Sequence, residues 1–84
     1  MEKRAGSAII LILTREDVQQ LNEILSKHSQ IIIGRLGLPR SNGQSIISLV
    51  LEGTTDQIGS LTGQLGLLRG IQVKSVLLKN IKDE

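Results

Sequence analysis

Four short runs rich in isoleucine, leucine and valine constrain the fold most, because amphipathic segments separate them in a repeated order. The runs are "SAIILIL", "QIIIGRLGL", "SIISLVLE" and "IQVKSVLL", and their length and β-branched content are typical of strands. Apolar residues recur at helical spacing from Val18 to His28, and again from Ile58 to Leu68. The predicted order of elements is therefore β-α-β-β-α-β.

This order predicts an α+β fold of the ferredoxin-like type, with one domain spanning residues 1–84. Such a fold has a four-stranded antiparallel sheet of order 4-1-3-2 and both helices on one face. Charged or strand-breaking residues should fall on edge strands. The second run carries Gly34, Arg35 and Gly37 and the last carries Gln72 and Lys74, so these two are the predicted edges.

Two segments have the composition of helix starts. In "TREDV", Thr14 is a candidate N-cap, and Asp17 three residues later imitates a capping box with a shorter acid. In "GTTDQ", Thr54 and Gln57 have the capping-box spacing. We therefore expect one helix to begin after Thr14 and the other after Thr54.

The segment "IIIGRLGLPRSNG" interrupts an otherwise apolar hairpin. Pro39 cannot donate a ladder hydrogen bond, so the strand should stop there, and Gly43 in the Asn-Gly pair suits a turn with positive φ. Gly34 and Gly37 indicate a bulge or the close approach of another backbone or ligand. Arg35 has two interpretations: it binds a carboxylate or phosphate, or it is a charge that blocks aggregation at a sheet edge.

Three glycines, Gly59, Gly63 and Gly66, lie inside the second predicted helix, where each costs about 1 kcal/mol relative to alanine. Gly59 and Gly63 are four residues apart and share a face. One interpretation is tight packing of this helix onto the sheet or onto a second copy. The other is room for a small molecule against the helix.

The strand pattern predicts a homo-oligomer, either a dimer or a tetramer. Two helices cover only one face of the sheet, yet the first and third runs are apolar on both faces. An apolar patch of that size on the other face commonly marks an interface. We assign this interface to Ile10, Ile46 and Val50.

Composition excludes several classes of function. The chain of 84 residues has no cysteine and no aromatic residue, which rules out disulfides, zinc–thiolate sites and base stacking on aromatic rings. The net charge of +2 is dispersed and His28 is the only histidine, so we expect no metal, no cofactor, no enzymatic activity and no direct nucleic-acid binding. No apolar run approaches the ~20 residues of a membrane span, so the expected location is the cytoplasm.

The stretches "QIIIGRLGLP" and "IISLVLEGTTDQIGSLTGQLGLLRGIQVKS" resemble a family of proposed iron-only hydrogenase system regulators, over residues 30–75. That family is similar to ACT-type regulatory domains and to the ligand-binding half of the nickel-responsive repressor. The resemblance implies an ACT-like fold, association through sheets and small effectors at interfaces. The chain lacks the repressor's ribbon-helix-helix segment, its cysteine and its clustered histidines, which argues against DNA binding and nickel sensing.

The resulting hypothesis is a small oligomeric regulatory or sensor domain that binds a small-molecule effector and acts on a partner protein. Thr14, Gly34, Arg35 and Gly37 are the predicted ligand-binding residues. Thr14 is included because ACT-type effectors sit near the first strand–helix turn. The alternatives are a structural or adaptor oligomer without ligand, and a component of a transcriptional regulator complex.

Overall fold

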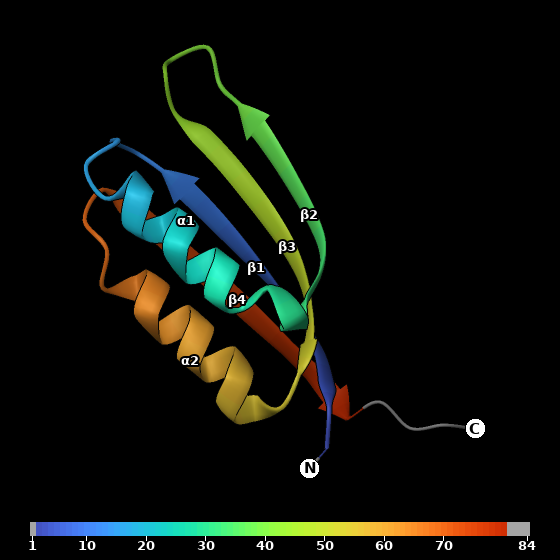
Figure 1. The fold of residues 1–84 in the computed structure, drawn as a ribbon. Helices are drawn as coiled ribbons and strands as arrows, with labels where there is room; N and C mark the ends of the chain where they lie inside the picture. The colour runs from blue at the N-terminus through green and yellow to red at the C-terminus, as the bar shows by residue number, and fades with distance from the viewer. Residues whose placement is uncertain (1, 81–84) are drawn as a thin grey trace.

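The computed structural model describes residues 2–80, and it has the predicted order of elements (Figure 1). The strands form one sheet of order β2-β3-β1-β4, in which every neighbouring pair is antiparallel. This is the predicted 4-1-3-2 order counted from the opposite edge, so the ferredoxin-like α+β prediction is confirmed. The elements are β1 (Arg4–Ile12), α1 (Val18–Lys27), the 3₁₀ turn η1 (Ser29–Ile31), β2 (Ile32–Pro39), β3 (Ser45–Gly53), α2 (Thr55–Gly66) and β4 (Ile71–Asn80).

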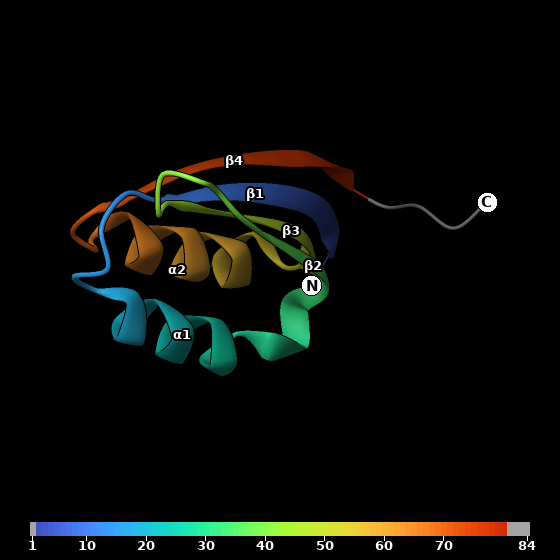
Figure 2. The same ribbon diagram turned by 90° about the horizontal axis from the view of Figure 1, so that it is seen from above.

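Both helices cover one face of the sheet and leave the other face bare (Figure 2). The core lies between these two layers and is entirely aliphatic. Burying one such side chain contributes roughly 1.5–3 kcal/mol, so a chain without aromatic residues depends on many of them. The largest fully buried side chains are Ile10, Leu21, Leu25, Leu49, Leu51, Leu61 and Leu65.

The sequence pattern assigns Ile10 of β1 to an interface on the bare face of the sheet, but the structure turns this residue toward the helices. Ile10 is 0% exposed and packs in the core, so it is not available on the bare face of the sheet. Ile9, which is 47% exposed, and the partly buried Leu11 lie on that face instead. Successive strand residues point to opposite faces, and an unbroken apolar run does not reveal which set is inside.

One of the two predicted helix starts is confirmed. Thr54 Oγ1 accepts a hydrogen bond from the Gln57 backbone N–H (3.1 Å), and Gln57 Oε1 accepts one from the Thr54 N–H (2.9 Å). The prediction for Thr14 is wrong, because α1 begins only at Val18. Asp17 occupies the N-cap position but makes no side-chain cap, since its carboxylate has another partner.

The glycines fall into distinct structural roles. Gly43 has a φ of 86° in the β2–β3 turn, as predicted. The register of β2 against β3 shifts between Ile32 and Gly34, which agrees with the irregularity that Gly34 indicated. The glycines of α2 do not pack against their own sheet, because a Cβ added to any of them would meet no atom within 4 Å apart from the adjacent residues and backbone of the helix itself. They leave a bare strip along the exposed side of the helix. These glycines are Gly59, Gly63 and Gly66.

Over residues 2–80, no helix combines the length and apolar character that crossing a membrane requires.

Candidate functional site

A cleft of about 260 Å³ lies between α1 and the far end of the β2–β3 hairpin. Its floor is apolar and belongs to the core, with Ile12, Leu21 and Ile47 all buried. Its rim is polar. The β2–β3 hairpin projects past the start of α1, so no helix lies over the tip of the hairpin (Figure 1). The rim residues include Arg15, Asn22, Arg35 and Ser45.

Two guanidinium groups border this cleft from different elements. Arg15 precedes α1, and Arg35 lies on β2 opposite Leu49, which faces the helices. Within residues 2–80, neither arginine forms an ion pair. Arginine binds carboxylate and phosphate groups through a planar fork of donors, so this rim suits an anion.

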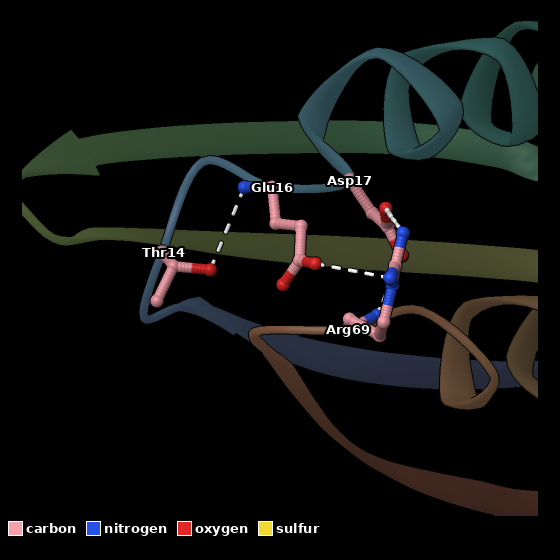
Figure 3. A network of polar contacts seen from close by, with 4 residues as sticks. All are labelled: Thr14, Glu16, Asp17 and Arg69. Atoms are coloured by element: carbon pink, nitrogen blue, oxygen red, sulfur yellow. Dashed lines mark hydrogen bonds and ion pairs between the residues drawn. The ribbon is translucent and has the colours of Figure 1, made fainter.

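A second polar cluster fixes the loop that carries Arg15 (Figure 3). The Arg69 backbone N–H donates to Asp17 Oδ2 at 2.7 Å. The guanidinium of Arg69 donates to the same carboxylate through Nε at 3.4 Å and through Nη2 at 3.3 Å. Arg69 Nη1 also lies 3.1 Å from Glu16 Oε2. We call this the Asp17–Arg69 clamp. It engages both acids of the loop and leaves Arg15 without them.

The clamp perturbs the protonation of both partners. The hydrogen bond from the Arg69 backbone N–H, followed by those from its guanidinium, lowers the pKa of Asp17 below its ordinary value of 3.8, although burial opposes the shift. The Asp17 carboxylate raises the pKa of Arg69 in turn. Asp17 is only 6% exposed, so the loop is held by a charged group that has lost most of its water.

Gly70 completes the attachment of this loop. Its carbonyl accepts hydrogen bonds from the backbone N–H groups of Leu13 (2.7 Å) and Thr14 (3.2 Å), and its φ is 73°. A Cβ at this position would collide with the Thr14 side chain. The β1–α1 loop and the α2–β4 connection therefore lie against each other as one unit.

Comparison with known proteins identifies the family. The model of the TM1266-like family, whose members are described as proposed iron-only hydrogenase system regulators, matches residues 4–75. This chain belongs to the TM1266-like family. The uncharacterized protein TM1266 from Thermotoga maritima is 41% identical, with a TM-score of 0.87 over 93% of this chain and 100% of that one. The family resemblance read from the sequence is therefore confirmed.

More distant solved structures share the fold alone. The ACT domain of GTP pyrophosphokinase from Chlorobium tepidum has a TM-score of 0.66 at 17% identity, over 100% of this chain and 96% of that one. The C-terminal domain of MgtC from Mycobacterium tuberculosis has a TM-score of 0.67 at 11% identity, over 96% and 94%. The first confirms the ACT-like architecture of the TM1266-like chain, and the second shares the same arrangement of elements. No match was found among curated proteins.

The structure brings together two of the four ligand-binding residues predicted for this TM1266-like chain. Arg35 and Gly37 both line the cleft. Gly34 pairs with Val50 and faces the other side of the sheet, and Thr14 abuts Gly70 in the clamped loop. Gly34 is separated from Arg35 and Gly37 because successive residues of a strand point to opposite faces. Thr14 stays in the loop because α1 begins only at Val18.

Sequence reasoning missed three polar residues of the cleft. Arg15 lies in the first strand–helix turn, residues 13–17, where the family resemblance places an effector, but it was not among the predicted ligand-binding residues. No local signal links it to Arg35 on another element. Asn22 lies on the exposed flank of α1, and Ser45 begins β3. Had α1 been predicted to begin after Asp17, Arg15 would have stood out as a loop cation.

The bare face of the sheet in the TM1266-like chain carries large apolar side chains. Val50 is 48% exposed, and Ile46 is partly buried. A hollow of about 250 Å³ lies on this face between Ile9, Leu11, Ile46, Gln72 and Lys74. Ile46 borders both this hollow and the cleft, so both lie next to the same residue of β3. We call Ile9, Leu36, Leu38, Val50 and Val76 the outer apolar face.

His28 ends α1 and takes part in a small polar contact with α2. Its Nδ1 donates to the Ile24 carbonyl oxygen at 2.8 Å in the tautomer that places the proton there, and its Nε2 lies 3.5 Å from Ser60 Oγ. Across the described part of the chain, no three histidine, cysteine, aspartate or glutamate residues gather into a candidate metal site.

Proposed function

We propose that this TM1266-like chain is a small cytoplasmic regulatory domain of an iron-only hydrogenase system that binds a small-molecule effector in the cleft between α1 and β2–β3. The observation that carries the proposal is the pair of arginines, Arg15 and Arg35, on the rim of an apolar-floored cleft without acidic partners in residues 2–80. The family description supports the regulatory role.

A ligand in the cleft would join two parts of the molecule that differ in how firmly they are held. The Asp17–Arg69 clamp holds the loop of Arg15, whereas Arg35 lies on an edge strand of a hairpin that projects past α1 (Figure 1). A bound effector that contacts both would restrain the hairpin. A ligand changes a conformational equilibrium only through such differential contacts.

We further propose that the domain works as a homo-oligomer through the outer apolar face. Exposed apolar side chains gathered on one face commonly mark an interface, and this face includes Val50, one of the predicted interface residues. Because Ile46 also borders the cleft, a second copy docked on this face would lie behind the wall of the ligand site. Effector binding would in this way influence assembly and the contact with a partner protein.

The test is a thermal-shift screen of the purified chain against amino acids, organic acids, nucleotides and neutral metabolites, followed by far-UV circular dichroism. A specific effector should raise the unfolding temperature of the wild-type chain and have a smaller effect on Arg35→Gln. Absence of stabilisation by every compound in a broad panel would contradict the proposal.

The second candidate function is a structural or adaptor oligomer without ligand. The observation in its favour is the exposed outer apolar face itself, which needs no effector to explain it. Under this alternative, Arg35→Gln would leave assembly unchanged and no compound would bind. A compound that binds wild-type and not Arg35→Gln would rule the alternative out.

A further inference from the structure

We infer that the cleft takes a small organic anion, a carboxylate or a phosphate monoester with a short aliphatic portion, whose charged end lies between Arg15 and Arg35. The inference rests on the proposed function and names the class of effector. It is drawn from the charge of the rim, the apolar floor and the size of the cleft.

The charge of the rim is unbalanced. The two nearest acids in the sequence, Glu16 and Asp17, are engaged by Arg69, which leaves Arg15 unpaired within residues 2–80. Arg35 borders the same cleft from β2, and within residues 2–80 it likewise forms no ion pair. An anion between the two guanidinium groups would accept charge-assisted hydrogen bonds from both.

An inorganic ion would not match the apolar lining of the cleft. The partly buried Val18 and the exposed Pro39 line it, and a small ion would leave their accessible apolar surface uncovered. The volume of about 260 Å³ falls just below the 300–1,000 Å³ typical of drug-sized ligands, which indicates a small metabolite. Asn22 and Ser45 on the rim can bond a further polar substituent.

The competing interpretation makes Arg35 only a charge that protects the edge of the sheet. A lysine serves that purpose equally well, because edge protection needs charge and not a planar fork. The variant Arg35→Lys therefore separates the two roles. It retains the charge on β2 and loses bidentate binding.

The experiment is a two-dimensional ¹H–¹⁵N NMR titration of the full chain with four probes: butyrate, monobutyl phosphate, inorganic phosphate and butyramide. Butyramide is the neutral match of butyrate, and inorganic phosphate lacks the aliphatic portion. We expect saturable shifts at the amides of Arg15, Gly37 and Ser45 with butyrate or monobutyl phosphate. Butyramide and inorganic phosphate should bind at least about tenfold more weakly, a difference of ~1.4 kcal/mol.

Three variants test the arginines, and their spectra also report whether each is folded. Arg15→Gln and Arg35→Gln should each weaken binding about tenfold or more, and Arg35→Lys should lose at least about threefold. Arg40→Gln is the matched control: it removes the same charge from the hairpin turn, outside the lining of the cleft, and should change binding less than about twofold.

The outcomes separate this inference from the function on which it rests. Butyramide binding as tightly as butyrate would overturn the anionic class and leave an effector cleft in place. Equal losses of affinity in Arg40→Gln and Arg35→Gln, or full affinity in Arg35→Lys, would show that binding depends only on diffuse positive charge. Either result would overturn specific binding of the anion between Arg15 and Arg35. If none of the four probes shifts the cleft amides, the inference is overturned. If, in addition, no compound of the broad metabolite panel raises the unfolding temperature, the proposed function is overturned too.

Discussion

The Asp17 carboxylate accepts hydrogen bonds from both the backbone N–H and the guanidinium of Arg69, 52 residues later in the chain (Figure 3). This contact joins the β1–α1 loop to the α2–β4 connection, and it takes Asp17 away from capping α1. The same carboxylate thus sets where the first helix begins and how Arg15 is presented to the cleft.

The Asp17–Arg69 clamp should make the stability of the fold depend on pH in the acidic range. Because the folded-state pKa of Asp17 is lowered from 3.8, the clamp stabilises fully above that value and is lost as the pH falls through the lower folded value. We expect the unfolding temperature of the wild-type chain to fall in this window more steeply than that of Asp17→Asn. Far-UV circular dichroism is the measurement, since the chain has no aromatic residue to give fluorescence.

Glu16→Gln is the control for this pH dependence. Glu16 contacts Arg69 only through an exposed ion pair, and exposed pairs contribute little to stability. Its acid response should match the wild type. If the unfolding temperatures of Asp17→Asn and Glu16→Gln depend on pH in the same way, the Asp17–Arg69 clamp does not stabilise the fold as its geometry indicates.

Gly70→Ala should destabilise the fold by about 1–2 kcal/mol or more, because the left-handed backbone conformation alone costs that much for an L-residue. At this position φ is 73° and the new Cβ would also collide with Thr14. Gly43→Ala is the matched control, since its φ is 86° but nothing lies within 4 Å of its Cβ. Urea unfolding should show the larger loss for Gly70→Ala, and the reverse order would contradict the packing of these two loops.

Gly63→Ala should stabilise the monomer by about 0.4–1 kcal/mol, because alanine restricts the unfolded chain and favours a helix. Nothing lies within 4 Å of a Cβ at this position. Gly6→Ala should do the opposite, since its Cβ would lie 2.9 Å from the Val76 carbonyl oxygen. A gain in unfolding free energy combined with weaker assembly would place a neighbouring chain on α2. Destabilisation of the monomer would mean that this side of the helix is not open.

Val50→Asp should weaken assembly of the chain by about tenfold or more, because burying an unpaired carboxylate in an apolar interface is costly. Leu67→Asp is the control, since Leu67 is 84% exposed and lies after α2, away from the outer apolar face. Light scattering during size-exclusion chromatography over a range of concentrations measures the effect. Equal behaviour of the two variants would argue against an interface on this face.

Part of the candidate site was predictable from sequence. Arg35 and Gly37 stood out because a charge and a glycine interrupt an apolar strand, and both line the cleft. Arg15 did not, because its importance depends on the position of α1 and on the distant residue that engages its acidic neighbours.

The sequence by itself determined the order of elements, the 4-1-3-2 sheet, the end of β2 at Pro39 and the Thr54 cap, because each depends on periodicity or on residues within a few positions. The tertiary structure alone decided which face of β1 is buried, since Ile9 and Ile10 are equally apolar. It also decided the start of α1 and the meeting of Arg15 with Arg35 at one cleft. These outcomes depend on contacts between distant segments, above all that of Asp17 with Arg69, which no local pattern encodes.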